Sequence, residues 1–158
     1  MEKATVIKAL KLSHIPRWVI IDLLKSQFVS DHVYRTQVLA LYMVQKLKLP
    51  VDEGKLILKA LFHDIEEGET GDVPSSHKGG KLDIRQSKNI DDCVLRLADT
   101  IEAEIWLSRY GVNPQRVRRF LESKIIFLEM ELAELSGILV NDIAEINNNM
   151  MDMGRHYD

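Results

Sequence analysis

Cysteine is almost absent from this sequence: Cys93 is the single one among 158 residues. One cysteine excludes an intramolecular disulfide, so a small secreted fold held by disulfide bridges is ruled out and an intracellular setting is the default. Residues 1–5 also lack the basic stretch, apolar run and small-residue cleavage site of a secretory signal. We therefore expect a cytoplasmic protein.

Long apolar runs and an excess of charge of one sign are also missing. No window approaches the roughly 20 apolar residues that cross a bilayer, so we expect no membrane partner. The 21 basic and 24 acidic residues give a formal net charge of −3, which offers no electrostatic reason to expect a nucleic acid polymer as partner. The 46% hydrophobic and 28% charged residues are typical of one soluble globular domain.

Residues that break helices are scarce, with four prolines and eight glycines. Apolar residues recur mostly at helical spacing, and no run alternates as a surface strand would. The pattern predicts an all-α fold with helices over about 2–12, 31–47, 88–110 and 114–147, and a further one that follows Asp52. Ser30 or Asp31, and Asp52, are the expected N-caps of two of these helices. We take residues 1–150 as one domain and 151–158 as a frayed tail.

Two segments stand apart from this pattern. Residues 68–80 contain four glycines, one proline and two serines, and loops of this length in a compact helical domain are often functional. The last long helix, over 114–147, has a broad apolar face. That face fits either the core of the domain or an interface between subunits.

Four polar side chains interrupt helical stretches that are otherwise apolar: His32, His63, Asp64 and Asp99. Because an isolated buried charge is costly, such residues usually have a partner or a metal ion. Two imidazoles and two carboxylates from three helices could surround a divalent transition metal and leave positions open for water and substrate. Taken singly, each has an ordinary alternative, since a histidine near a helix end is often a cap and a mid-helix aspartate is often a salt-bridge partner.

The order of these residues along the chain resembles that of a known family. Residues 63–74 have the form H-D-x-x-E-x-x-T-G-D-x-P, with Arg17-Trp18 and His32 before them and Asp99 after them. This order resembles the HD-domain phosphohydrolases, and more narrowly the YfbR-like 5′-deoxynucleotidases and the DatZ-like phage dATP triphosphohydrolases. The likeness covers about residues 10–110. It implies a single HD-domain helical bundle with a metal site between helices.

The resemblance also implies which residues hold the cofactor and do the chemistry. The metal would be a divalent ion (cobalt, zinc, manganese or magnesium), and its ligands would be His32, His63, Asp64 and Asp99. Glu67 would act as a general acid or base beside the ion, as its spacing from the ligands on a continuing helical turn would allow.

The same resemblance assigns the substrate contacts. Arg17 would bind phosphate oxygens, Trp18 would pack against the sugar and leave no room for a 2′-hydroxyl, and Asp72 would accept a hydrogen bond from the 3′-hydroxyl. Lys78, near the end of the glycine-rich segment, and Lys81, just after it, could meet a phosphate chain, although a solvated loop is an equally good interpretation. Residues 75–77, which end in a histidine, depart from the YfbR-like pattern and keep a triphosphate substrate open.

The expected function is therefore hydrolysis of the 5′-phosphate ester of a small-molecule deoxynucleotide by attack of water on the α-phosphorus. A monophosphate would give deoxynucleoside and phosphate, and a triphosphate such as dATP would give deoxynucleoside and tripolyphosphate. The resemblance also implies a homo-oligomer. Two alternatives stay open: a non-catalytic HD domain that senses nucleotides or scaffolds partners, and a cyclic-nucleotide phosphodiesterase.

Overall fold

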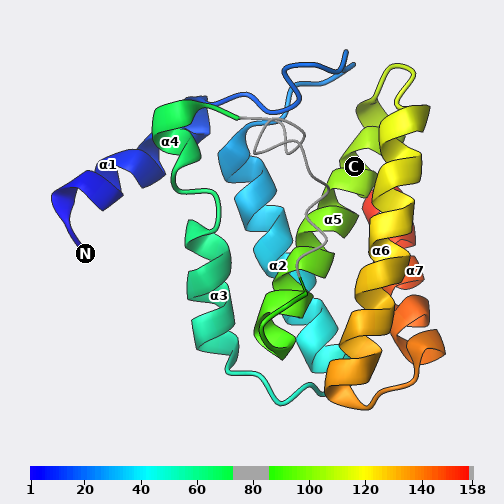
Figure 1. Ribbon diagram of the computed structural model, residues 1–158. Coiled ribbons are helices and arrows are strands. Elements are labelled where there is room, and N and C mark those ends of the chain that lie inside the picture. Colours follow the sequence, from blue (N-terminus) through cyan, green and yellow to red (C-terminus); the bar gives the residue numbers. More distant parts are fainter. Residues whose placement is uncertain (73–85, 157–158) are drawn as a thin grey trace.

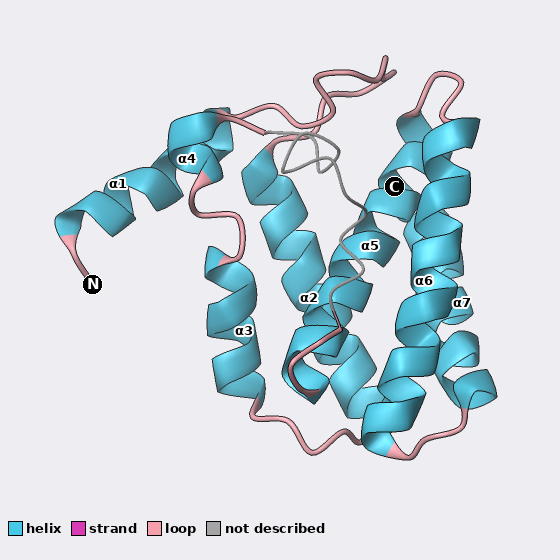
Figure 2. Ribbon diagram, viewed as in Figure 1, coloured by secondary structure: helices cyan, strands magenta, loops and turns pink. Residues whose placement is uncertain are grey.

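The computed structural model describes residues 1–72 and 86–156, and most of these residues are helical (Figure 1). The elements, in chain order, are α1 (Lys3–Lys11), the 3₁₀ helix η1 (Leu12–His14), α2 (Val29–Leu47), α3 (Glu53–Phe62), α4 (Glu67–Thr70), α5 (Ile90–Tyr110), α6 (Gln115–Ser136) and α7 (Val140–His156). The described part of the chain contains no β-strand, only two isolated bridges (Figure 2). The prediction of an all-α fold is confirmed.

Helix α5 is the central element of the bundle. It packs against α2 and α3 on one side and against α6 and α7 on the other (Figure 1). Because neighbours surround it, polar side chains of α5 such as Glu102 and Glu104 are buried, and each must find a partner inside the protein.

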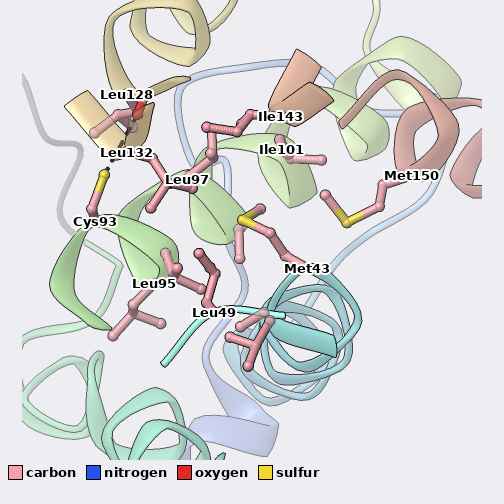
Figure 3. Close-up of a cluster of buried hydrophobic side chains, with 14 of the residues drawn as sticks. Met43, Leu49, Cys93, Leu95, Leu97, Ile101, Leu128, Leu132, Ile143 and Met150 are labelled. Carbon is pink, nitrogen blue, oxygen red and sulfur yellow. Dashed lines mark hydrogen bonds between the residues drawn. The ribbon is translucent and has the colours of Figure 1, made fainter. Parts of the chain in front are cut away.

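The main hydrophobic core lies where α5 meets α2, α6 and α7 (Figure 3). Its largest fully buried side chains include Met43, Leu97, Ile101, Leu128, Leu132, Ile143 and Met150, each of which contributes roughly 1.5–3 kcal/mol by leaving water. The thiol of Cys93 donates a hydrogen bond to the carbonyl oxygen of Leu128 at 3.5 Å. Leu128 and Leu132 belong to the apolar face predicted for residues 114–147. Because both are buried here, this part of the face belongs to the core of the domain.

Side chains at the helix starts explain several of the observed boundaries. The carboxylate of Asp52 accepts a hydrogen bond from the backbone N–H of Lys55, as expected for the N-cap of α3. Helix α2 begins earlier than expected, with Phe28 as its N-cap rather than Ser30 or Asp31. Asp31 instead lies in the first turn, where its carboxylate accepts the backbone N–H of Phe28. Its charge there also complements the helix dipole.

The prediction of one long final helix is wrong, because two helices occupy that part of the chain. Gly137 adopts a left-handed conformation with φ of 74° and ends α6, after which α7 begins at Val140. The prediction of a frayed tail over residues 151–158 is also corrected, because α7 continues to His156. Buried Met150 and Gly154 hold this last part of α7 to the bundle. A Cβ atom on Gly154 would lie 2.6 Å from Ile105, so only glycine allows this close approach.

The segment between η1 and α2 returns on itself and carries residues of the site. Residues Pro16 and Phe28 form an isolated antiparallel bridge, and the backbone N–H of Arg17 donates to the carbonyl oxygen of Gln27 at 2.8 Å. Gln27 and Val29 are fully buried, so the start of α2 anchors the segment. No helix in residues 1–72 or 86–156 combines the length and the apolar character needed to span a membrane.

Candidate active site

Two histidines and two aspartates come together at one point of the bundle. The Nε2 atom of His32 lies 3.0 Å from Oδ1 of Asp99 and 3.5 Å from Oδ2 of Asp64. The Nε2 atom of His63 lies 3.2 Å from the same Oδ2 of Asp64, and the two imidazole rings are 5.4 Å apart. The sequence prediction that these residues gather in space is confirmed.

Three segments of the chain supply these side chains. His32 belongs to the first turn of α2, Asp99 lies in the middle of α5, and His63 and Asp64 directly follow the last residue of α3. We expected the helix to continue through Glu67, but it does not. Turns occupy residues 63–66, and α4 begins at Glu67. This change of direction leaves the His-Asp pair at an open helix end that faces α2 and α5.

Hydrogen bonds on the far side of each imidazole fix its orientation. The Nδ1 atom of His32 lies 2.6 Å from Oε2 of Glu102, and the Nδ1 atom of His63 lies 2.6 Å from the carbonyl oxygen of Ala60. Because both partners can only accept, each Nδ1 carries a proton. In a neutral ring the lone pair is then on Nε2, toward the two aspartates. Metal-binding histidines are commonly held in this way.

The electrostatics of the metal-free cluster are dominated by His32 and its neighbours. Burial and the Arg17 charge oppose protonation of His32, but Glu102 and Asp99 outweigh them and raise the pKa of the imidazole to about 9. Burial opposes ionisation of Asp99, but His32 and Lys124 outweigh it and hold the pKa of this carboxyl well below its usual range. His32 and Asp99 are thus paired as imidazolium and carboxylate, and an ion that binds His32 must displace its proton.

The donor set fits a divalent cation. Ligand atoms of His32, His63 and Asp99 all lie within 4.8 Å of one another. The Nε2 atoms of both histidines are buried, and among the described residues they face the carboxylates of Asp64 and Asp99 in contacts that lack hydrogen-bond geometry. An ion between them would satisfy both atoms, and a mixture of imidazole and carboxylate suits zinc, cobalt and manganese. Asp64 adjoins this group through its contacts with both rings.

Arg17 and Trp18 lie beside this cluster, as the sequence led us to expect. The Nη1 atom of Arg17 lies 3.4 Å from Oε2 of Glu102, and its guanidinium carbon lies 5.0 Å from the centre of the Trp18 ring. Trp18 has a left-handed backbone with φ of 66°. Oδ2 of Asp72 accepts the backbone N–H of Trp18 at 2.8 Å, so Asp72 holds the tryptophan in place.

Glu67 is a buried carboxylate at the start of α4, with 5% of its surface exposed. The next residue, Gly68, packs against α1 so closely that a Cβ atom there would lie 2.6 Å from the carbonyl oxygen of Lys8. On the outer side, Lys8 pairs with Glu66 and Glu69. These contacts separate Glu67, which faces inward, from the exposed acidic residues beside it.

An open cleft of about 730 Å³ adjoins the cluster. His63 and Asp99 lie in its wall, together with four cationic side chains, Lys59, Lys88, Arg96 and Lys124. The cleft lies between α3, α5 and α6, and its wall also contains Asp92, so its four cations outnumber its two carboxylates. None of these four cations was predicted from the sequence as a substrate contact. Lys78 and Lys81, which were predicted, and the histidine at 77 lie outside the described residues.

Glu102 and Gln27 also belong to the site but were not predicted from the sequence. Both residues are buried, at 1% and 0% exposed, and the Nε2 of Gln27 donates to Oε1 of Glu102 at 2.7 Å. A signal existed for Glu102, because it lies three residues after Asp99 and therefore on the same face of an apolar helix. Gln27 comes from an irregular segment, where spacing carries no such signal.

Comparisons of the sequence identify relatives with named activities. Residues 9–106 match the family described as "HD domain". The chain is 26% identical over 127 residues to a dATP triphosphohydrolase of Salmonella phage PMBT28, with 65% of each chain covered. It is 32% identical over 74 residues to a dATP triphosphohydrolase of Cyanophage S-2L, which covers 46% of this chain and 42% of that one. The matched parts thus span less than two thirds of these relatives.

Solved structures show the same fold. The Cyanophage S-2L HD phosphohydrolase DatZ, bound to dA and one catalytic Zn²⁺ ion, matches with a TM-score of 0.77 at 20% identity, covering 99% of this chain and 98% of that one. A conserved hypothetical protein from Pyrococcus furiosus matches with a TM-score of 0.61 at 19% identity, covering 99% and 100%. Identities this low carry the architecture to this chain and nothing finer.

Proposed function

Because the chain belongs to the HD domain family, we propose that it is a metal-dependent phosphohydrolase that cleaves the 5′-phosphate ester of a deoxynucleotide. The observation that carries the proposal is the convergence of His32, His63, Asp64 and Asp99, from three separate segments, on one point. Two phage relatives named dATP triphosphohydrolase support a deoxynucleotide as the substrate class.

We assign the role of metal ligands to His32, His63, Asp64 and Asp99, and the role of cofactor to zinc, cobalt, manganese or magnesium. When bound, such an ion supplies Lewis acidity, which polarises a phosphoryl oxygen and makes water a better nucleophile at neutral pH. Glu102 and the Ala60 carbonyl hold the two imidazoles in the tautomer that coordination requires.

The chain's own residues then handle the proton and the phosphate. Glu67, inside the fold at the start of α4, accepts the proton of the attacking water and later gives it to the leaving oxygen. The water oxygen bonds to the α-phosphorus while the bond from phosphorus to O5′ breaks. Arg17 binds the phosphate oxygens, since a guanidinium can bind two of them at once and stabilise the charge that develops.

Sugar recognition falls to Trp18 and Asp72. The indole packs against the deoxyribose and occupies the space that a 2′-hydroxyl would need. Asp72 supports this position by accepting the Trp18 backbone N–H through Oδ2, and its other oxygen is assigned to the 3′-hydroxyl. Such discrimination depends on a rigid indole, because a side chain that can move aside excludes nothing.

The cationic cleft favours a triphosphate over a monophosphate. A single phosphate at the α position would need none of the four cations in the cleft. Two of them, Lys59 and Arg96, are paired with Asp92 and Glu131. Lys124 influences Asp99 electrostatically, which brings its charge to the cluster itself. A polyphosphate chain that leaves the α-phosphorus through this cleft would meet several of these cations. We therefore propose hydrolysis of a triphosphate such as dATP to deoxynucleoside and tripolyphosphate.

The proposal is tested by incubating the purified protein with dATP, dAMP and dTMP in the presence of zinc, cobalt, manganese or magnesium. Chromatography separates the nucleoside product, and phosphorus NMR distinguishes tripolyphosphate from pyrophosphate and phosphate. We expect deoxyadenosine and tripolyphosphate from dATP, at a higher rate than any product from dAMP. If none of these nucleotides is hydrolysed with any of the metals, the proposed phosphohydrolase activity is refuted.

Three other outcomes have a distinct meaning. Deoxynucleoside from dAMP alone would retain the phosphohydrolase and replace the triphosphate by a monophosphate. Nucleotide binding without turnover, with substoichiometric metal in the purified protein, would favour a non-catalytic nucleotide sensor. Hydrolysis of 3′,5′-cyclic AMP in the same assay would favour a phosphodiesterase instead.

A further inference from the structure

Glu102 is a buried carboxylate with three partners, two from the segment before α2 and one from α2 itself. Its Oε2 lies 2.6 Å from Nδ1 of His32 and 3.4 Å from Nη1 of Arg17, and its Oε1 accepts the Nε2 of Gln27 at 2.7 Å. Both oxygens are thus used, at a position with 1% exposure. A buried carboxylate satisfied in this way is costly to disturb, because each partner would lose its acceptor.

The side-chain amide of Gln27 links Glu102 to Trp18 through two hydrogen bonds. A carboxylate can only accept, so the amide NH₂ of Gln27 must face Glu102. The amide oxygen of Gln27 then faces the other way, where it accepts the indole Nε1–H of Trp18 at 2.7 Å. If the amide were reversed, two donors would meet at the indole and two acceptors at the carboxylate. Glu102 therefore determines which way the amide points, and the amide positions the indole.

The backbone of Trp18 makes these side-chain contacts necessary. Its φ of 66° is in the left-handed region, which a bulky residue adopts only when its surroundings impose it. Two contacts do so here: Asp72 accepts the backbone N–H, and Gln27 accepts the indole N–H. Loss of the second contact would leave the ring held only by packing and by the Arg17 guanidinium that lies over it.

We propose that Glu102 and Gln27 are positioning residues that tie the sugar-selecting Trp18 to the metal ligand His32, so that one buried carboxylate orients both. The inference rests on the proposed deoxynucleotide hydrolase. The inference predicts different effects for the two residues. Gln27 positions only the indole of Trp18, whereas Glu102 positions both the imidazole of His32 and, through Gln27, the indole.

The first experiment changes Gln27→Met, which retains the length of the side chain and removes its hydrogen bonds. We expect the ratio of kcat/KM for dATP to that for ATP to fall about tenfold, the effect of roughly one lost hydrogen bond on discrimination. Metal affinity should change less than about threefold. A variant that is merely less stable lowers both rates together and leaves the ratio unchanged, so the ratio separates positioning from a loss of folded protein.

The second experiment changes Glu102→Gln, with Glu104→Gln as a matched control. Both glutamates belong to α5 and are buried, but Glu104 pairs with Arg118 on the side away from the cluster. For Glu102→Gln we expect metal affinity, measured by chelator competition on metal-free protein, to fall about 10- to 100-fold. The dATP to ATP ratio should fall as well. Glu104→Gln should change neither value.

A third measurement is independent of activity. The chain has two tryptophans, so Trp106→Phe leaves Trp18 as the only one. In this background, we expect Gln27→Met to increase acrylamide quenching of Trp18 fluorescence in the metal-free protein at least about twofold, because the indole gains freedom. If no nucleotide is hydrolysed, the proposed function fails while quenching and metal affinity still decide this inference. Unchanged quenching in Gln27→Met, or unchanged metal affinity in Glu102→Gln, would overturn it.

Discussion

Asp99 and Glu102 lie one helical turn apart on α5 and hold opposite nitrogens of the same imidazole. Oδ1 of Asp99 is 3.0 Å from Nε2 of His32, and Oε2 of Glu102 is 2.6 Å from Nδ1. The two carboxylates have different surroundings, since the Asp99 side chain is 31% exposed and that of Glu102 is 2% exposed. Asp99 can therefore meet an ion and substrate at the cleft, whereas Glu102 can act only through its neighbours.

Because Asp99 is exposed at the cleft, it gives the most direct test of the proposed metal centre. We expect Asp99→Asn to lower metal affinity and dATP hydrolysis by at least about 100-fold, because it removes the charge of a ligand and not only its support. Metal content by atomic emission and initial rates at saturating metal measure the two effects. Asp91→Asn, at the start of the same helix, is the control and should retain both. Full metal content in Asp99→Asn would contradict the ligand assignment.

Glu67 should affect the chemical step without affecting the metal. We expect Glu67→Gln to lower kcat by about 100- to 10,000-fold, the usual contribution of a general acid or base, with metal content unchanged. Single-turnover rates and metal analysis check the two parts. Glu69→Gln is the matched control, because Glu69 lies two residues away in the same acidic run but on the exposed side, where it pairs with Lys8. An equal loss of kcat in both variants would contradict a catalytic role for Glu67.

The helices could be predicted largely because their apolar residues recur at helical spacing and caps such as Asp52 mark their starts. The prediction failed at Gly137, where Ile138 and Leu139 continue the apolar pattern across a break that depends on one left-handed residue. It failed again in the tail, because asparagine and glycine are poor helix formers. Packing of Gly154 against α5 outweighs that low propensity, and such packing cannot be read from spacing.

The candidate metal ligands could be predicted for a different reason. The spacing of His63 and Asp64 relative to Glu67 is local in sequence, and the order of His32 and Asp99 around them resembles a known pattern. The residues that support them were missed, since Gln27 meets its partners only when the segment before α2 folds back toward α5. The cationic cleft was missed for the same reason, because three separate helices line it.

Lys124 tests whether a phosphate chain occupies that cleft. We expect Lys124→Gln to raise KM for dATP roughly fivefold, as the loss of one partly solvated charge contact predicts, while KM for dAMP stays nearly constant. Steady-state kinetics with both substrates over a range of salt concentrations measures the effect, which should shrink as salt rises. Lys11→Gln, on α1 and outside the cleft lining, is the control. An equal change for both substrates would argue against a polyphosphate in the cleft.

Glu129 offers a prediction about stability that does not involve the site. Burial raises the pKa of this carboxyl above its ordinary 4.5, although the bond from Asn147 opposes the rise. The folded protein therefore binds this proton more tightly than the unfolded chain, and the associated stability is lost as pH rises from 4.5 through the raised pKa. We expect Glu129→Gln to increase the free energy of unfolding by about 0.5–1 kcal/mol at pH 7 and by less at pH 4. Urea denaturation at both pH values, with exposed Glu134→Gln as control, measures the difference, and a variant that loses stability at pH 7 would contradict the prediction.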